Sequence, residues 1–201
     1  MSDTWTIAQA AMIIEKPSQL LQRTVERAPV KPTLARRGGR RIYVFEMRDL
    51  VFFCALDDMK DGITSNKQIE LYKALKSMPA ETAIGSINIG SLRYDFKPYV
   101  RRVKKNIEAT EKLFRLIDRT GDEPVIKGTD INAYRIAALH DGMTVQEILR
   151  DYPSLSEPQV LAAKAYAESH PKSGRPYPRS TAKKIILEAR ADAGQFLPAR
   201  G

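Results

Sequence analysis

Apolar residues recur three or four positions apart in two stretches near the start of the chain, residues 7–14 and residues 20–25. This spacing places the apolar side chains of each stretch on one face of a helix. Lys16-Pro17 interrupts the pattern between the stretches, and Pro29 ends the second one. Two short helices separated by a tight break are typical of a helix-turn-helix.

A hairpin pattern follows these two predicted helices. Gly38-Gly39 is a turn signal, and the β-prone residues 42–45 come directly after it. The predicted hairpin is tipped with four arginines, Arg36, Arg37, Arg40 and Arg41. A tight basic hairpin has the shape of a wing beside a recognition helix. Two further helices are expected over residues 46–60 and 65–78.

The middle of the chain changes to an alternating pattern. Apolar and polar residues alternate over residues 87–96 around a two-residue Gly90-Ser91 turn, which predicts a second hairpin. Pro98 then begins a long helix whose apolar positions from Val103 onward follow near-heptad spacing, with Lys and Arg on its other faces. This helix packs either on its own domain or against a second copy of the chain.

The last part of the chain predicts a short strand within residues 123–128, followed by three helices over residues 131–140, 144–152 and 156–170. Several helix starts are predicted by capping signals, a Ser or Thr with a Glu or Gln three positions later, at Thr6, Ser65, Thr144 and Ser156, and Ser18 is expected to cap the second helix. A final helix from Ser180 to Ala193 lies in a tail with few apolar residues, which we expect a partner to order.

These elements predict a fold that is mainly α with small β hairpins. We expect a winged helix-turn-helix DNA-binding domain at residues 1–78, a hairpin and a linking or dimerisation helix at 79–120, a three-helix helix-turn-helix-like domain at 121–170, and a basic tail at 171–201. The length of 201 residues is sufficient for two small domains.

The charge distribution points to anionic partners. The chain carries 33 Lys and Arg against 24 Asp and Glu, and the basic residues concentrate in residues 23–48, 97–115 and 170–201, around an acidic segment at 116–169. Basic blocks suit phosphate backbones or an acidic protein, although they are also common on solvated faces. The single cysteine, Cys54, the lack of a signal-peptide pattern and the absence of a long apolar run lead us to expect a cytoplasmic protein.

The stretch from Glu123 to His170 resembles a known family. Pro124-Val125-Ile126, the Gly128-Thr129 turn, the HDGMT break, the EILRDYPSL string and the Ala-rich AAKAYA helix match the family catalogued as domain of unknown function 433. The family pattern often has an arginine after Gly-Thr, where this chain has Asp130. The resemblance implies the antitoxin of a type II toxin–antitoxin pair, partnered with a PIN-like ribonuclease toxin.

The N-terminal part is similar to the MerR-type winged helix-turn-helix. The likeness lies in TIAQAAMII and in RRGGRRIYVFEMRDLVFF, and the recognition-helix aromatic residue common in that group is missing from SQLLQRTVER. The combination resembles the larger Vap-type antitoxins. It implies a homodimeric repressor of its own operon that binds a pseudo-palindromic operator in double-stranded DNA and requires no cofactor.

Candidate DNA-binding residues lie on the second helix and on the wing. The exposed candidates on the helix are Ser18, Gln19, Gln22, Arg23 and Arg27, and those on the wing are Arg36, Arg37, Arg40 and Arg41. Side chains on one face of a helix in the major groove reach base edges, whereas wing arginines meet phosphates or the minor groove. The alternative is a solvated basic face.

The tail is expected to bind the toxin, because PIN-like nucleases hold divalent metal with several carboxylates and a guanidinium there would form charge-assisted pairs. The candidates are Arg175, Tyr177, Arg179, Lys183, Lys184, Ile186, Arg190 and Phe196, with Ile185 as a further apolar anchor. The alternatives are a tail that folds back on its own domain or one that binds DNA nonspecifically.

No catalytic pattern is evident, so we do not expect an enzyme. The chain has two histidines, no zinc-ligand spacing, no P-loop and no nucleophile motif, and the acidic group Asp57, Asp58 and Asp61 is typical of a solvated helix end. Two alternatives to the antitoxin remain. One is a stand-alone MerR-like regulator that responds to a ligand, and the other is a protein inhibitor that no longer binds DNA.

Overall fold

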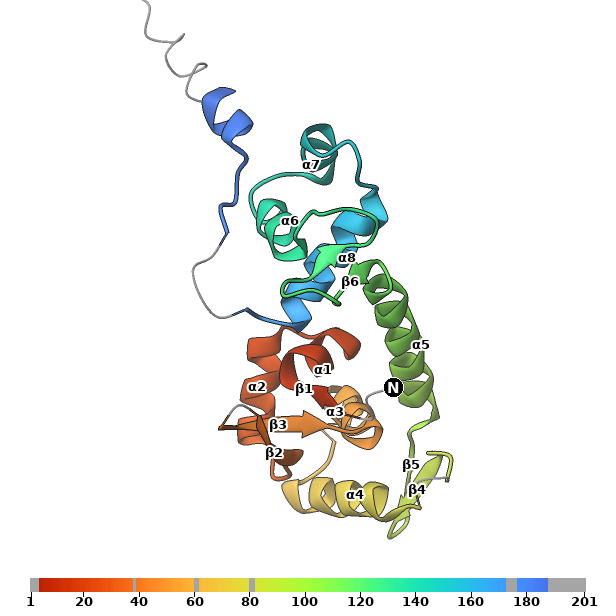
Figure 1. Ribbon diagram of the computed structural model, residues 1–201. Coiled ribbons are helices and arrows are strands. Elements are labelled where there is room, and N and C mark those ends of the chain that lie inside the picture. The colour runs from red at the N-terminus through yellow and green to blue at the C-terminus, as the bar shows by residue number, and fades with distance from the viewer. Residues whose placement is uncertain (1–3, 38, 60–61, 80–81, 173–176, 188–201) are drawn as a thin grey trace, which may run out of the picture. The chain divides into compact units, whose positions relative to one another are not determined.

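The computed structural model describes residues 4–37, 39–59, 62–79, 82–172 and 177–187. It is mainly helical with small antiparallel sheets, which confirms the predicted fold class at that level. The chain divides into two compact units, Met1–Glu111 with Glu168–His170 (unit 1) and Lys112–Ala167 with Pro171–Gly201 (unit 2). Figure 1 labels their helices and strands. None of the helices within the described residues is long and apolar enough to cross a membrane.

Unit 1 contains five helices and two antiparallel sheets among its described residues. The helices are α1 (Ile7–Ile13), α2 (Ser18–Arg27), α3 (Met47–Met59), α4 (Ser65–Ser77) and α5 (Lys97–Phe114, whose residues up to Glu111 belong to this unit). The strands are β1 (Trp5–Thr6), β2 (Thr33–Arg37), β3 (Arg40–Phe45), β4 (Ser86–Ile89) and β5 (Leu92–Asp95).

Both predicted hairpins are present in unit 1. Strands β2 and β3 pair around Gly39, which has a positive φ of 77°, and β1 adds to the outer edge of β3 in the order β1-β3-β2. Strands β4 and β5 pair with Ile89 opposite Leu92, and Gly90 in their turn also has a positive φ, of 61°. Glycine adopts this backbone conformation without the steric cost that a Cβ would bring, so both turns were readable from sequence.

The helix starts follow the capping signals in part. Thr6 and Gln9 form the predicted capping box of α1. The predicted cap at Ser18 is wrong, because Pro17 occupies the capping position and Ser18 is the first helical residue. Similarly, Thr64 rather than Ser65 caps α4, by accepting a hydrogen bond from the backbone of Lys67.

One hydrophobic core extends through unit 1. It contains the fully buried Phe45, Phe52 and Phe53, and it also takes in Ile87 and Ile89 of the second hairpin. Phe45 and Phe52 each pack edge-to-face on Phe53, with ring centroids 5.8 and 5.5 Å away. The hairpin of residues 86–95 therefore shares the core of the first helices.

Helix α5 packs on the core of its own unit. Val103 is fully buried, and Tyr99, Val100 and Ile107 are partly buried against the same core. The Nδ2 of Asn106 donates to the carbonyl of Ile13 at 2.8 Å, which satisfies an orphan acceptor at the end of α1. Of the two packing modes considered for this helix, its apolar face uses the one on its own domain.

Unit 2 is a small helical unit with one strand pair. Its elements are β6 (Ile117–Asp118), β7 (Val125–Ile126), α6 (Ala133–His140), α7 (Val145–Asp151) and α8 (Glu157–Ser169, up to Ala167 in this unit). Strands β6 and β7 are antiparallel, and Ile126, Ile136 and Ile148 are fully buried in the core. Asn132 caps α6, and Thr144 with Glu147 forms the predicted capping box of α7.

A fully buried carboxylate, Asp49, ties together several elements of unit 1. Its oxygens accept hydrogen bonds from the backbone N–H of Glu46 at 2.8 Å and from the hydroxyl of Tyr72 at 2.7 Å. The Nζ of Lys76 lies 3.3 Å from the carboxylate and 2.7 Å from Glu46, so the buried charge is paired. The Tyr72 hydroxyl also lies 3.0 Å from the carbonyl of Lys31, just after α2.

Replacing Tyr72 with Phe is expected to lower the free energy of unfolding by about 1–3 kcal/mol, because the buried carboxylate loses a donor. Urea unfolding followed by circular dichroism measures the change. Tyr94→Phe is the matched control, since the Tyr94 hydroxyl is buried and has no hydrogen-bond partner among the described residues. Equal losses in the two variants would contradict the assigned network.

Candidate nucleic-acid interface and basic segment

Helix α2 has one buried face and one free face. Leu21 and Val25 are fully buried, and each such burial stabilises by about 1.5–3 kcal/mol, which fixes that face on the core. Gln19, Arg23 and Arg27 are spaced four residues apart, so they form a stripe on the opposite side of the helix, and all three are exposed. The helix therefore presents a row of hydrogen-bond donors to solvent.

The remaining predicted residues of α2 are also exposed. Ser18 lies in the first turn, and the Nε2 of Gln22 donates to Glu26 at 3.0 Å, one turn further on. Leu20, at 50% exposure, is an apolar member of the free surface that the sequence reasoning left out. Leu20 therefore adds an exposed apolar side chain next to the donor row, of the kind that can contact thymine methyl groups in a major groove.

The turn between α1 and α2 is held in place from α3. Glu15 has a positive φ of 57°, and the side chain of Lys16 reaches across to α3. Its Nζ donates to the carbonyl of Phe53 at 3.1 Å and pairs with Asp57 at 2.6 Å. The side chain of Lys16 is only 11% exposed, so this pair is better shielded from water than an ordinary surface pair.

The other end of α2 is capped by a lysine. The Nζ of Lys31 donates to the carbonyls of Val25, Glu26 and Ala28, the last two at 2.7 and 3.0 Å. These carbonyls have no partner within the helix, and a cation at this end also interacts favourably with the helix dipole. Both ends of α2 are thus fixed independently of its exposed face.

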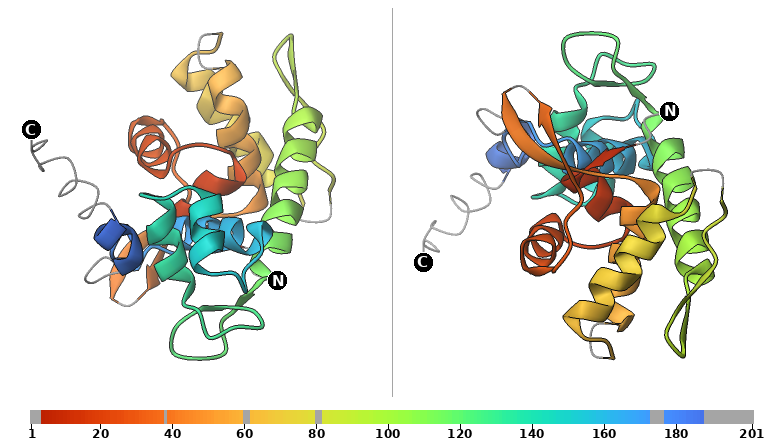
Figure 2. Two further views of the ribbon diagram at one scale, coloured as in Figure 1. Left: turned by 90° about the horizontal axis from the view of Figure 1, so that it is seen from above. Right: turned by 90° about the horizontal axis from the view of Figure 1, so that it is seen from below.

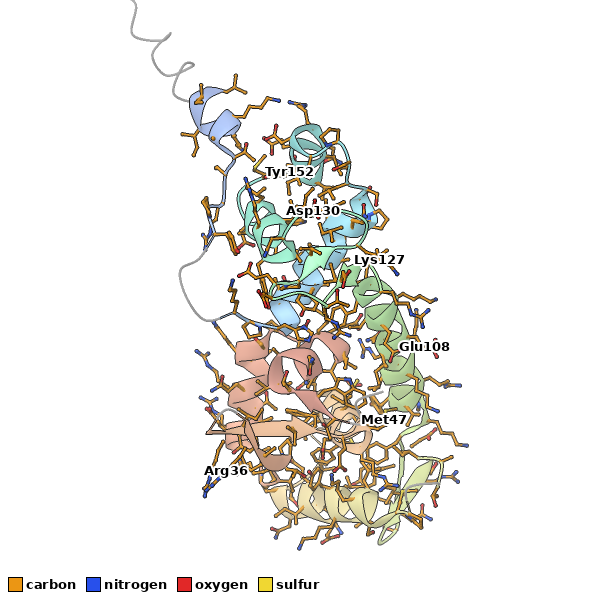
Figure 3. All side chains as sticks on the ribbon, viewed as in Figure 1. Arg36, Met47, Glu108, Lys127, Asp130 and Tyr152 are labelled. Atoms are coloured by element: carbon orange, nitrogen blue, oxygen red, sulfur yellow. The ribbon has the colours of Figure 1, made fainter. Side chains whose placement is uncertain are left out.

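The β2–β3 hairpin presents arginines at its tip. Arg36 lies directly opposite Arg41 in the strand register, and both are exposed, with Arg36 pointing away from the unit (Figure 3). Arg37 pairs with Arg40 in the backbone register, but their side chains lie outside the described residues. Like charges opposite one another destabilise a hairpin, whereas an anionic ligand would neutralise them.

Helix α2 and the β2–β3 hairpin lie on the same side of unit 1, and α5 lies on the opposite side (Figure 2). The donor stripe of α2 and the arginines of the hairpin consequently belong to one side of the unit. The sequence predicted the polar residues of α2 and the arginines of the hairpin as candidates, but it did not predict that they share one side of the unit.

The basic segment, defined as residues 177–187, packs on unit 2. The Tyr177 hydroxyl donates to Glu123 at 2.9 Å, and the Lys172 amine pairs with the same carboxylate. Residues 182–187 are helical, which covers part of the helix predicted from Ser180 to Ala193.

Helix α7 holds the second half of the basic segment. The Thr181 hydroxyl donates to Asp151 at 2.6 Å, and Lys183 pairs with the same carboxylate at 3.4 Å. The Nζ of Lys184 lies 3.1 Å from Glu147 and 3.2 Å from the carbonyl of Gly142. The segment thus makes the contacts of a tail folded back on its own domain, one of the alternatives left open by the sequence.

The predicted toxin-binding residues differ in where they lie. Tyr177, Lys183 and Lys184 contact unit 2 as above, Arg179 is exposed, and Ile185 and Ile186 are 53% and 52% exposed. Arg175, Arg190 and Phe196 lie outside the described residues. The residues that receive the segment were missed, although the acidic sign of residues 116–169 was a visible signal.

The carboxylates that receive the segment have lowered pKa values. The backbone N–H of Thr144 and then the Lys184 amine lower the pKa of Glu147 from its usual 4.5 to about 2. The hydroxyl of Thr181, followed by Lys183, lowers the pKa of Asp151. Hydrogen bonds from Lys172 and Tyr177 lower the pKa of Glu123. A lowered pKa contributes stability that is present above the usual value and lost as pH falls through the lowered one.

No cluster of three His, Cys, Asp or Glu side chains suited to a metal ion is found in the part of the chain that the structure describes. In the acidic group of α3, Asp57 is paired with Lys16, and Asp58 accepts a hydrogen bond from Tyr99 at 2.9 Å. Asp61 lies outside the described residues.

Comparison with known proteins identifies a family over part of unit 2. Residues 118–167 match the family described as a protein of unknown function, DUF433, which confirms the resemblance for that segment. An uncharacterized protein of Sinorhizobium fredii, y4eO, is 32% identical over 89 residues, which are 42% of this chain and 40% of that protein. The chain therefore spans less than half the length of this relative. No solved structure shows significant similarity.

Replacing Lys184 with Met is expected to raise the pKa of Glu147 above about 2 without restoring 4.5, because the Thr144 N–H remains bonded to the carboxylate. An NMR titration of the glutamate side-chain carboxyl carbons measures it. Lys127→Met removes an exposed lysine of the same unit and is expected to leave this pKa unchanged. If Lys184→Met has no effect either, the Lys184–Glu147 pair does not form in solution.

Proposed function

We propose that this chain is the antitoxin of a type II toxin–antitoxin pair, which represses its own operon as a homodimer and inhibits a PIN-like ribonuclease. The observation that carries the DNA-binding half is the common side of unit 1 shared by the donor stripe of α2 and the exposed arginines of the β2–β3 hairpin. The antitoxin half rests on the match of residues 118–167 to the DUF433 family, which the sequence resemblance associates with antitoxins, and on the basic segment of the same unit.

In this proposal, unit 1 is a winged helix-turn-helix of the MerR type. Helix α2 enters the major groove, where Arg23 can bond a guanine and Gln19 an adenine. The hairpin is the wing, and Arg36 and Arg41 meet phosphates or the minor groove. A two-fold dimer would place two copies of α2 on the half-sites of a pseudo-palindromic operator.

In the same proposal, the basic segment and the residues around it bind the toxin. The metal-holding carboxylates of a PIN-like nuclease form a strongly negative site, which lysine and arginine side chains would pair with and obstruct. The exposed Ile185, Ile186 and Leu187 provide apolar contact area beside the lysines. The partner would therefore be held by charge and apolar burial together.

A stand-alone regulator that responds to a small ligand is the second candidate. Such a regulator needs a ligand pocket and a folded tail. A cavity of about 430 Å³ in unit 2 supports this function, because the folded basic segment forms one of its walls. Arg135 and Leu139 of α6 and Tyr152 after α7 line the other side. This function requires no nuclease partner. The two candidate functions can therefore be distinguished by whether the neighbouring gene encodes a nuclease.

The double variant Arg36→Ala/Arg41→Ala is expected to weaken binding to the upstream DNA and to reduce the steepness of its salt dependence by about 2, since each lost phosphate contact removes ~0.9 from the slope. Fluorescence anisotropy over a salt series measures both. Arg101→Ala/Lys104→Ala removes equal charge from exposed positions on α5 and serves as the control. Indistinguishable slopes in the two double variants would argue against the wing.

Arg23→Ala is expected to relax sequence preference at one operator position, costing about 1–3 kcal/mol of discrimination there if the guanidinium bonds a guanine. Binding-site selection with the variant and the parent protein measures this. A uniform loss across all sequences would instead assign Arg23 to a phosphate.

Co-expression with the product of the neighbouring gene tests the antitoxin half. The full chain is expected to co-purify with a ribonuclease and to silence it, and Lys183→Ala/Lys184→Ala is expected to weaken the complex, because these lysines would pair with its carboxylates. Lys97→Ala/Lys104→Ala controls for net charge. A neighbouring product that neither binds the chain nor cleaves RNA would favour the ligand-responsive regulator.

A further inference from the structure

We propose that an acidic surface of unit 2 is a docking site for the chain's own basic segment, and that this docking competes with binding of an acidic protein partner. The acidic surface consists of Glu123, Glu147 and Asp151, and the basic segment is residues 177–187 as defined above. The docking stands on contacts within unit 2. The competition additionally rests on the proposed function, which supplies the acidic partner.

The lysine amines of the basic segment are already occupied. The Nζ of Lys184 has two acceptors, the carboxylate of Glu147 and the carbonyl of Gly142, and its side chain is only 24% exposed. Lys183 and Thr181 share the carboxylate of Asp151, which is 12% exposed. A carboxylate of another protein that takes the place of Glu147 or Gly142 at the Lys184 amine must therefore displace these contacts.

Gly142 shows how closely the basic segment approaches unit 2. A Cβ added at Gly142 would lie 2.4 Å from the backbone carbonyl oxygen of Arg179, well inside the range that real Cβ atoms avoid. Gly142 has no positive φ, so the backbone itself accepts alanine without strain. The contact with Arg179 is therefore the specific obstacle to a side chain at this position.

The apolar residues of the segment remain accessible while the lysines are held. Ile185, Ile186 and Leu187 are each more than half exposed. A partner that buries these side chains would first contact the docked form and then replace the Glu147 and Asp151 contacts with its own carboxylates. The partner that fits is thus a protein surface with an apolar patch beside a cluster of carboxylates.

The competition has a quantitative consequence. If the docked form makes up about 90% of the free protein, the measured affinity for a partner that requires the released form is about tenfold weaker than the intrinsic affinity. Undocking the segment should recover that factor. Substitutions on the acidic surface should therefore strengthen partner binding although they change none of the residues that bind the partner.

The first experiment measures docking without any partner. Limited trypsin digestion of the full chain, followed by mass spectrometry, gives the cleavage rate after Lys183 and Lys184. Gly142→Ala is expected to raise this rate about tenfold over the parent protein, whereas Gly121→Ala is expected not to change it, since a Cβ at Gly121 meets only the carbonyl of Glu123 at 3.9 Å. Equal rates in all three proteins would overturn the docking.

A second variant guards against misfolding of Gly142→Ala. Glu147→Gln/Asp151→Asn removes two charges of the acidic surface, and a glutamine at position 147 can keep the capping box with Thr144. The same increase in cleavage is expected, with unchanged helix content by circular dichroism. Fast cleavage of Gly142→Ala together with slow cleavage of this double variant would overturn the ionic basis of docking.

The second experiment measures competition with the ribonuclease that the proposed function expects the neighbouring gene to encode, by surface plasmon resonance. Both undocking variants are expected to bind about tenfold more tightly than the parent and the Gly121→Ala control. Unchanged affinity in variants whose segment is released would overturn the competition while leaving the proposed function intact. Failure of every protein to bind the ribonuclease would overturn the competition together with the proposed function, and the cleavage rates would still decide the docking.

Discussion

The Asp49 carboxylate and its donors connect the elements that carry the free face of α2. Asp49 lies on α3, Tyr72 and Lys76 come from α4, and the Tyr72 hydroxyl also meets the carbonyl of Lys31. The amine of Lys31 in turn holds the end of α2. A buried charge stripped of its partners costs about 3–5 kcal/mol, so the network favours arrangements of α3, α4 and the end of α2 that keep these contacts. Together with the burial of Leu21 and Val25, the network holds α2 on the unit.

Charge serves two purposes in this chain. In unit 1, the exposed Arg36 and Arg41 stand opposite one another on β2 and β3, an arrangement suited to an external anion. In unit 2, lysines of the basic segment meet glutamate and aspartate of the same unit. The net charge of +9 does not distinguish these situations, because only the fold determines which basic residues are already neutralised.

The sequence was most informative where two local signals agreed. The glycine turns of both hairpins and the capping boxes at Thr6 and Thr144 combine residue type with spacing, and the structure has them as predicted. The capping signal at Ser65 was wrong, because the adjacent Thr64 also carries a hydroxyl and the backbone dihedrals choose between the two residues. The burial of Asp49 and the packing of the basic segment against Gly142 involve residues distant in sequence, where local patterns carry no information.

The docked segment is tethered by a very short connection. Lys172 and Tyr177 bind the same carboxylate of Glu123, and only four residues separate them in the sequence. A short tether gives the segment an effective concentration in the millimolar range at its own docking site. Contacts too weak to hold a free peptide can therefore keep the site filled. A free acidic protein at micromolar concentration can displace the segment only if its affinity offsets this difference in concentration. Weakly binding acidic proteins are therefore excluded, whereas a partner with high affinity is not.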